Sequence, residues 1–440
     1  MNLLVQSIGR GAGAAAIATR LEAAIADGSL VPAERLPAVR ELASELEVSP
    51  ATVAAAYRTL RQRGLVSANR RRGTVVATQP PLRVRGARPL PAGTRNLAGG
   101  NPDPALLPPL APALARLSPE HKLYGGPVKL ARLVELAQAD FAADGVAGDI
   151  AIVGGALDGI ERVLQTQLRP GDRVVVEDPS WPRITDLVHA LGLESEPVAV
   201  DQRGLVPAAL ERALEHGARA VITTSRGQNP IGAAVDGDRA RALTERLGRH
   251  PAVVLIEDDY LSAVAGAPYH SLHAASPRWV LIRSLSKVLG PDLRVGTVAG
   301  DPLTISQVEG RQLLGSGWVS HLLQQTAANL WGSAATRKLL ARAERTYSER
   351  RAALVDALAG HGITAHGATG LGVWIPLAEE VEIVQQLLER GWAVSPGERY
   401  RFETPPGIRI TTTDLEPGDA RALAGAIAEV VHGTGGTYAG

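Results

Sequence analysis

The sequence predicts two folded parts, a small helical unit that ends in a β-hairpin and a larger α/β domain. Within the first 64 residues, apolar side chains recur at helical spacing in three short stretches, and two β-branched runs follow them. From about residue 96 onward, short apolar strands alternate with helical stretches, which is the pattern of a largely parallel sheet. A chain of 440 residues is also long enough for more than one domain.

The small unit is expected to contain three helices and a wing-like hairpin. Apolar residues three or four positions apart place the first helix at about residues 17–25 and the second at about residues 39–46. The third begins at Ser49 and Pro50, because serine favours the N-cap and proline the first helical position. Two short strands then flank a basic turn at residues 69–73. Many small helical domains share this spacing, so the pattern alone does not establish DNA binding.

Basic charge is concentrated at the N-terminal end. Residues 1–95 contain 14 arginines, no lysine and 6 carboxylates, whereas the remainder has 32 basic and 39 acidic residues. A genome-wide preference for arginine explains the lack of lysine, but residues 48–102 also contain no carboxylate. This asymmetry predicts a polyanionic partner for the small unit. The arginines placed to neutralise DNA phosphates are Arg40, Arg58, Arg61, Arg63, Arg70, Arg71 and Arg72.

Composition also predicts the domain boundaries. Residues 79–95 are rich in proline, glycine and arginine, and predict a fairly stiff linker. The predicted domains are residues 1–78 and residues 96–440, and the second has a smaller C-terminal subdomain from about residue 340. Buried strands are expected at residues 173–176, 220–222, 253–256 and 280–282, and helices at residues 156–168, 238–248 and 337–360.

Several classes of protein are excluded or disfavoured by composition. The chain has no cysteine, which excludes disulfides, thiolate nucleophiles and cysteine-ligated metals. The first residues lack the basic and apolar segments of a signal peptide, and no run of 18 apolar residues exists to span a bilayer. We therefore expect a cytoplasmic protein that makes no membrane contact, and we predict no metal site.

Only one of the four lysines follows a buried strand and lies among phosphate-binding residue types. Lys287 comes after the apolar run at residues 279–285, with Ser284 and Ser286 just before it and Arg294 seven residues later. Hydroxyls and a guanidinium bind phosphate dianions. A Schiff base with pyridoxal 5′-phosphate (PLP) needs a lysine in this setting. The alternative is a surface lysine at a strand end. The other lysines are Lys122, Lys129 and Lys338.

Polar residues that suit the PLP ring follow two predicted strands. Asp258 and Asp259 end the run that begins at residue 253, and a carboxylate there can keep a pyridine nitrogen protonated. The hydroxyl of Tyr260 and the amide of Asn229 can hydrogen-bond the 3-oxygen of the ring. Consecutive acids after a strand can equally form a metal site or a solvated loop.

Two further features fit a phosphorylated aromatic ligand. Gly154, Gly155 and Ala156 precede a predicted helix, whose N-terminal amides can bind phosphate. Trp181 can stack on a ring. Taken alone, a Gly-Gly pair is weak evidence, and a single tryptophan is more often part of a core.

The N-terminal sequence resembles the GntR-type winged helix across about residues 9–78. The run LPAVRELASELEVSPATVAAAYRTLRQRGLV, followed by RRRGTVV, is in register with that family. The resemblance implies DNA contacts from Arg40, Ser49 and Thr52, in addition to the arginines above. Pro50 departs from the family, which often has arginine directly after the Val-Ser pair. Operator preference therefore cannot be carried over.

Residues 96–432 resemble the fold-type I aminotransferases through the SLSK-x6-R, EDDY and QNPIG blocks. The resemblance assigns Lys287 to the internal aldimine and Asp258, by motif register, to the pyridine nitrogen, although the sequence leaves Asp259 open. It assigns Arg409 to a substrate carboxylate and Tyr124 to the neighbouring subunit's phosphate. Ring contacts are implied for Tyr260, Asn229 and Trp181, and phosphate contacts for Ser284, Ser286, Arg294, Gly155 and Ala156.

A GntR-type winged helix joined by a linker to an aminotransferase-like domain resembles the MocR-type transcription regulators. The resemblance implies a homodimer, usually head to tail, that binds promoter DNA. It also implies a sensor of PLP, or of an amino compound bound as an external aldimine. An active aminotransferase is the main alternative, and a PLP-free dimerisation scaffold is a third. Asn229, where MocR proteins often have tyrosine or phenylalanine, and the lack of a histidine-arginine cluster at residues 337–351 put the effector in doubt.

Overall fold

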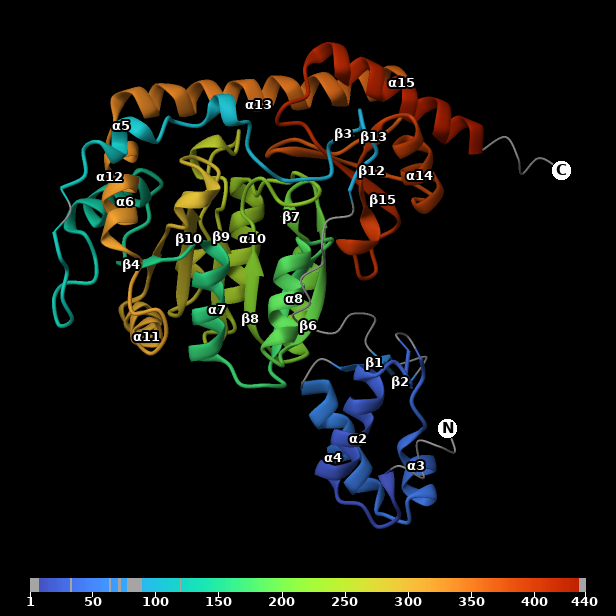
Figure 1. Cartoon of the computed structure of the whole chain (residues 1–440). Helices are drawn as coiled ribbons and strands as arrows, with labels where there is room; N and C mark the ends of the chain where they lie inside the picture. The colour runs from blue at the N-terminus through green and yellow to red at the C-terminus, as the bar shows by residue number, and fades with distance from the viewer. Residues whose placement is uncertain are drawn as a thin grey trace. The chain divides into compact units, whose positions relative to one another are not determined.

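The computed structural model describes residues 8–31, 34–62, 65–69, 73–76, 89–118 and 120–434 (Figure 1). The chain has two compact units. The first contains residues 1–87 and two short segments from later in the chain, residues 169–173 and 183–195, and the second contains the other residues from Arg88 onward. The predicted wing arginines Arg70, Arg71 and Arg72 lie outside the described residues, as do Arg63 and most of the predicted linker. None of the helices among the described residues combines the length and apolar character that crossing a membrane requires.

The N-terminal unit contains the three helices and the hairpin that the sequence predicts. Its elements are α2 (Ala14–Ala26), α3 (Val39–Glu45), α4 (Pro50–Gln62), β1 (Val66–Asn69) and β2 (Gly73–Val76). Ser49 caps α4 by accepting a hydrogen bond from the Thr52 amide at 3.1 Å. The Tyr57 hydroxyl donates to the carbonyl of Pro37 at 2.9 Å and joins α4 to the start of α3. Leu42, Leu46 and other apolar side chains fill the core between the helices.

An eight-stranded sheet forms the centre of the larger unit (Figure 1). The order is β4 (Asp149–Val153), β11 (Gly296–Gly300), β10 (Trp279–Ser284), β9 (Val254–Asp258), β8 (Ala218–Thr223), β5 (Arg173–Asp178), β6 (Glu194–Asp201) and β7 (Gly204–Leu205). Strands β8, β9 and β10 are parallel, as predicted. Strand β11 is antiparallel to both β10 and β4, because residues 285–295 reverse the chain. The sheet is therefore mixed, with an antiparallel edge that the sequence pattern did not reveal.

Helices cover this sheet. Helix α7 crosses strands β9, β10 and β11, and Gly159 allows the close approach, since an added β-carbon would lie 3.3 Å from Ile282 Cδ1 (Figure 1). The α-helices of this part are α5 (Ala111–Leu114), α6 (Ala131–Ala143), α7 (Ala156–Gln167), α8 (Pro182–Ala190), α9 (Pro207–Glu215), α10 (Gly237–Gly248), α11 (Pro302–Leu313) and α12 (His321–Trp331). Short 3-10 turns are η1 (Pro104–Leu106), η2 (Ser262–Val264), η3 (His273–Ala275), η4 (Pro291–Leu293) and η5 (Gly397–Arg399).

A smaller subdomain follows the long helix α13 (Ala334–Gly360). Its antiparallel sheet has the order β12 (Gly372–Pro376), β15 (Gly407–Thr411) and β14 (Ser395–Pro396). Strand β13 (Trp392–Ala393) pairs in parallel with β3 (Arg95–Asn96), so the chain just after the predicted linker is part of this subdomain. Helices α14 (Val381–Glu389) and α15 (Pro417–Thr434) pack on it, and α15 lies beside α13 (Figure 1).

Asp178 ties the smaller subdomain to the end of β5. Its carboxylate accepts hydrogen bonds from the amides of Phe402 and Glu403, both at 2.8 Å, and of Thr404 at 3.0 Å. Two residues later, the Ser180 amide donates to the carbonyl of Tyr400 at 2.7 Å. These contacts fix residues 400–404 beside the segment that carries Trp181.

We predict that Asp178→Ala destabilises the folded state, because three backbone amides lose one shared acceptor. The expected loss is about 2–4 kcal/mol, since an unsatisfied buried donor costs about 1–3 kcal/mol. Asp172→Ala is the matched control, because within the described part of the chain the Asp172 carboxylate accepts one hydrogen bond, from the amide of Arg169. Thermal unfolding followed by circular dichroism checks this. Equal transition temperatures for the two variants would refute the structural role of Asp178.

Candidate functional site

The predicted cofactor residues converge at the carboxyl ends of the central strands, where open α/β sheets usually bind ligands. Asp258 is the last residue of β9 and pairs in register with Ile282 of β10. Lys287 follows β10 by three residues, Asn229 lies in the loop after β8, and Gly155 follows β4. The structure therefore brings together residues that are separated by more than 100 positions in the chain.

Lys287 is half-buried at this end of the sheet, and its Nζ donates a hydrogen bond to the carbonyl of Gly100. Burial, together with the nearby guanidinium of Arg409, lowers the pKa of Lys287 to about 8. A larger fraction of the amine is therefore neutral, and so nucleophilic, near neutral pH than for an ordinary lysine.

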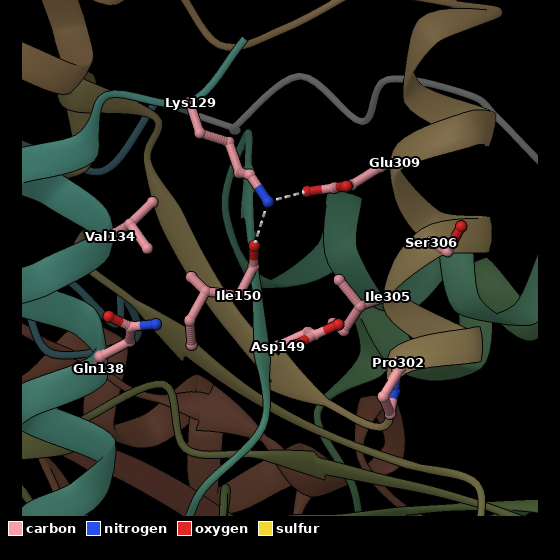
Figure 2. Close-up of a pocket in the computed structure, with 9 residues that line it drawn as sticks. All are labelled: Lys129, Val134, Gln138, Asp149, Ile150, Pro302, Ile305, Ser306 and Glu309. Atoms are coloured by element: carbon pink, nitrogen blue, oxygen red, sulfur yellow. Dashed lines mark hydrogen bonds and ion pairs between the residues drawn. The ribbon is translucent and has the colours of Figure 1, made fainter. Parts of the chain in front are cut away.

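Lys129, in contrast, forms an ion pair and a backbone hydrogen bond within the protein. Figure 2 shows it at a cavity of about 290 Å³, where its Nζ lies 2.6 Å from Glu309 Oε1 and donates to the carbonyl of Ile150 at 2.9 Å. Because Ile150 belongs to the edge strand β4, Lys129 satisfies a carbonyl at the sheet edge. Lys122 is paired with Glu120 at 3.0 Å. Neither lysine has the setting of Lys287.

Asp258 provides a buried carboxyl group that is incompletely satisfied. Burial is the main cause that raises its pKa, to about 8, and the carboxylates of Asp259 and Glu177 add to the effect. Asp258 Oδ1 has no hydrogen-bond partner among the described residues, and the same holds for the buried Asn229 Oδ1 and Ser286 Oγ. Buried polar atoms are normally paired, so three orphaned atoms in predicted ligand residues fit a polar ligand that contacts all three.

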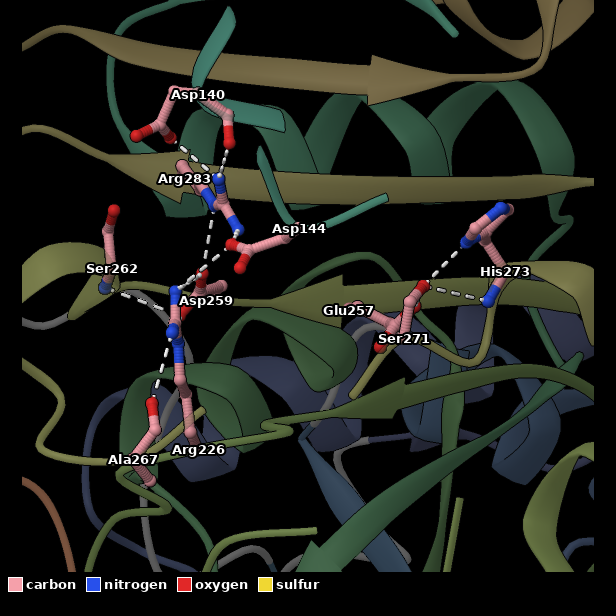
Figure 3. A network of polar contacts seen from close by, with 10 residues as sticks. All are labelled: Asp140, Asp144, Arg226, Glu257, Asp259, Ser262, Ala267, Ser271, His273 and Arg283. Atoms are coloured by element: carbon pink, nitrogen blue, oxygen red, sulfur yellow. Dashed lines mark hydrogen bonds and ion pairs between the residues drawn. The ribbon is translucent and has the colours of Figure 1, made fainter. Parts of the chain in front are cut away.

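Asp259, by contrast, is fully paired inside the protein (Figure 3). Its carboxylate accepts two hydrogen bonds from Arg226, at 2.9 and 2.8 Å, and one from Arg283 at 2.9 Å. Burial opposes ionisation, but these two guanidinium groups outweigh it and hold the pKa of Asp259 below its usual value. Arg283 also binds Asp140 at 2.6 Å and contacts Asp144. Asp259 is therefore a structural anion, a role that its sequence position did not reveal.

Glu177 is a second buried carboxylate that the sequence analysis missed. It accepts hydrogen bonds from the Thr223 hydroxyl at 2.9 Å, the Thr224 amide at 2.8 Å and Gln228 Nε2 at 3.1 Å. Burial raises its pKa to about 7, against the effect of these donors. Glu177 thus holds the loop that presents Asn229. The available signal was its place at the end of a predicted buried strand, beside Asp178.

The predicted phosphate site combines a helix N-terminus with a guanidinium. Gly155 is the N-cap of α7 with φ +116°, a conformation that glycine adopts readily, and Ala156 is the first helical residue. Arg294 Nη2 donates to the carbonyl of Gly154 at 2.8 Å. A β-carbon on Gly155 would lie only 2.6 Å from the same Nη2 atom. The Ser284 hydroxyl accepts the Ser286 amide at 3.2 Å. These groups form a positively charged cradle suited to a phosphate.

Four more residues that the sequence predicted for the site differ in how far they are buried and in what they contact. The Tyr260 hydroxyl donates to the carbonyl of Gly227 at 2.8 Å, which leaves its oxygen able to accept. Buried Arg409 donates to the Gly99 carbonyl at 3.1 Å and to Thr411 Oγ1 at 2.9 Å. Trp181 is half-buried. Tyr124 is 93% exposed, and its ring contacts Trp318 with centroids 5.5 Å apart, so this chain does not bring it to Lys287.

On the N-terminal unit, Arg40 of α3 and Arg58 of α4 are exposed, and neither guanidinium has a partner among the described residues. Ser49 and Thr52 share a side-chain hydrogen bond of 2.8 Å at the start of α4. Thr52 is half-buried and Ser49 is exposed. The start of α4 and the exposed side of α3 thus present hydroxyl and guanidinium donors.

Two family profiles match the chain. The aminotransferase class I and II family matches residues 95–427, and the gntR family of bacterial regulatory proteins matches residues 14–76. The vitamin B6 salvage pathway transcriptional repressor PtsJ of Salmonella typhimurium is 40% identical over 410 residues, or 92% of this chain and 95% of that protein. The pyridoxine biosynthesis transcriptional regulator PdxR of Corynebacterium glutamicum is 31% identical over 76% of both chains.

Solved aminotransferases share the fold of the larger unit. Kynurenine aminotransferase of Pyrococcus horikoshii has a TM-score of 0.72 at 22% identity, over 78% of this chain and 92% of that chain. The α-aminoadipate aminotransferase LysN of Thermus thermophilus, solved with N-(5′-phosphopyridoxyl)-L-leucine, has a TM-score of 0.70 at 22% identity, over 78% and 93%. The predicted fold, a winged helix followed by a fold-type I aminotransferase domain with a small subdomain, is confirmed.

The contrast between the two adjacent acids yields a prediction. Asp259→Asn should destabilise the protein by about 3–5 kcal/mol, because it leaves two buried guanidinium groups without their shared counter-charge. Asp258→Asn is the matched control and should be nearly neutral in the ligand-free protein, since it removes a carboxyl group with an orphaned oxygen. Chemical unfolding measures both. A larger loss for Asp258→Asn would reverse the assignment.

Proposed function

Because the chain belongs to the MocR-type transcription regulators, in which a GntR-type DNA-binding domain precedes an aminotransferase-like domain, we propose that it senses PLP and alters its DNA binding in response. One observation carries the proposal. A lysine with a lowered pKa lies at the same end of the sheet as three buried polar atoms that lack partners among the described residues. The lysine and these polar residues fit the aldehyde, ring and phosphate of PLP.

The relatives support genes of vitamin B6 metabolism as the regulated targets. One relative is a repressor of vitamin B6 salvage and another regulates pyridoxine biosynthesis. If PLP is the end product of the genes that the protein controls, binding of PLP is enough to regulate them, and no other effector is needed. The N-terminal domain binds double-stranded DNA. We propose that the DNA contacts come from Arg40, Ser49, Thr52, Arg58, Arg70, Arg71 and Arg72.

Each end of PLP has a proposed set of ligands. Bound PLP supplies an aldehyde that condenses with an amine and a ring that withdraws electrons. Lys287 presents the neutral amine, and Asp258 faces the ring nitrogen because Asp259 is occupied by two arginines. The 3-oxygen is bound by Asn229 and Tyr260, and Trp181 covers the ring. The phosphate is bound by Ser284, Ser286, Arg294, Gly155 and Ala156.

An amino compound can modulate the same site. Arg409 is buried beside Gly100, whose carbonyl accepts the hydrogen bond from Lys287, since a β-carbon on Gly100 would lie 3.8 Å from Arg409 Nη2. Its guanidinium can bind the carboxylate of an amino acid. We propose that the chain forms a head-to-tail homodimer. Four exposed apolar side chains, Leu123, Tyr124, Leu313 and Leu314, support an interface with another subunit. In such a dimer Tyr124 contacts the phosphate in the neighbouring subunit.

The lowered pKa of Lys287 predicts how the rate of PLP capture changes with pH. Only the neutral amine attacks an aldehyde, so the rate of PLP capture by ligand-free protein should rise with pH through a midpoint near 8, not near the ordinary lysine value of about 10.4. Stopped-flow absorbance measures this rate.

Lys287→Ala should show no absorbance of bound PLP, whereas Lys338→Ala should behave like the wild type. Wild-type protein that never acquires the absorbance contradicts the cofactor assignment.

Arg40→Ala should weaken binding to the promoter fragment upstream of the chain's own gene. Loss of one phosphate contact lowers the slope of log K against log salt by about 0.9. Arg132→Ala removes the same charge from the larger unit and should leave binding unchanged. Gel retardation at several salt concentrations checks this. Unchanged retention by Arg40→Ala would exclude the contact, and multiple-turnover transamination without promoter binding would favour an aminotransferase.

A further inference from the structure

Residues 34–36 run beside β2 of the N-terminal hairpin and pair with it through an isolated antiparallel bridge. The Leu36 amide donates to the carbonyl of Thr74, and the Val76 amide to the carbonyl of Glu34, both at 2.8 Å. Between these bonds, Arg35 forms an antiparallel bridge with Val75. Because side chains alternate along a strand, Leu36 enters the core and Arg35 faces solvent.

The Arg35 side chain extends along this outer face to the first residue of β2. A β-carbon built on Gly73 would lie 3.4 Å from Arg35 Nε and 3.7 Å from its Nη2. Gly73 has φ +77° and pairs with Asn69, the last described residue before the basic residues 70–72. The arginine is thus placed at the wing without being in the turn.

Nothing in the described part of the unit neutralises Arg35. Its guanidinium has no hydrogen-bond or ion-pair partner among the described residues. Four carboxylates of the unit have other contacts, which are Asp27 with the Ser29 amide at 2.9 Å, Glu34 with the Val31 amide at 2.8 Å, Glu41 with the Ala38 amide at 3.2 Å and Glu47 with Arg10 at 2.6 Å. The exposed guanidinium is therefore available to an external anion.

We propose that Arg35 contacts a DNA phosphate from the edge of the wing. The inference rests on the proposed DNA binding and adds a residue that the winged-helix motif does not assign. The planar guanidinium matches the oxygens of a phosphate. The guanidinium lies close to Gly73, so it is exposed at the end of the hairpin that adjoins residues 70–72. A phosphate contact positions the protein and is insensitive to base sequence.

The test measures affinity of the full-length protein for a mixed-sequence DNA duplex at several salt concentrations. Arg35→Ala should bind several-fold more weakly, with the slope of log K against log salt reduced by about 0.9. Arg35→Met should lose as much, because it keeps the length of the side chain over Gly73 and removes only the charge. Arg35→Lys should keep most of the slope. Arg20→Ala, which removes an exposed arginine of α2, is the control and should match the wild type.

Two results would overturn the inference. Wild-type affinity and slope in Arg35→Ala would exclude the contact, and wild-type affinity in Arg35→Met alone would show that packing, not charge, is responsible. The PLP absorbance and the unfolding temperature of all four variants should equal those of the wild type, since Arg35 has no partner in the described part of the chain. If the wild-type protein itself binds neither this duplex nor the promoter, the proposed DNA binding fails first, which separates the two outcomes.

Discussion

The ion pairs of Asp259 with Arg226 and Arg283 are the interaction on which the cofactor end of the sheet depends. Strand β9 ends at Asp258, and Asp259 follows it directly. The protein neutralises Asp259 with two buried arginines, whereas Asp258 Oδ1 has no hydrogen-bond partner in the described part of the chain. Arg226 precedes the loop of Asn229, and Arg283 precedes Ser284, so the same network aligns three strand ends that carry proposed PLP ligands.

Strand β5 uses its two terminal acids in a similar way. Glu177 accepts three hydrogen bonds from residues at and after β8, including one from Gln228, the neighbour of Asn229. Asp178 accepts three amides of residues 402–404 in the smaller subdomain. Trp181 lies just beyond both. These contacts join residues 402–404 of the smaller subdomain to the strand end that precedes Trp181, the residue proposed to cover the ring.

The helices and central strands were predictable, and Lys287 could be proposed as the PLP lysine, because strand hydrophobicity, helix caps and phosphate-binding residue types can be recognised within short stretches of sequence. Contacts between distant residues were not predictable in this way. The partners of Asp259 lie 33 and 24 residues away, β3 pairs with a strand almost 300 residues later, and β11 reverses direction through a short connection. One sequence could therefore name both Asp258 and Asp259 but could not distinguish their roles. The wing arginines, although evident in sequence, lie outside the described residues.

The central claim is that PLP at Lys287 controls DNA binding, and one measurement tests it directly. Fluorescence anisotropy of the labelled promoter fragment is recorded against protein concentration, with and without PLP, for the wild type and for Lys287→Ala. The account predicts that PLP changes the wild-type Kd and leaves the Kd of Lys287→Ala unchanged. Equal wild-type affinities in both conditions, or an equal PLP response in the variant, would contradict it.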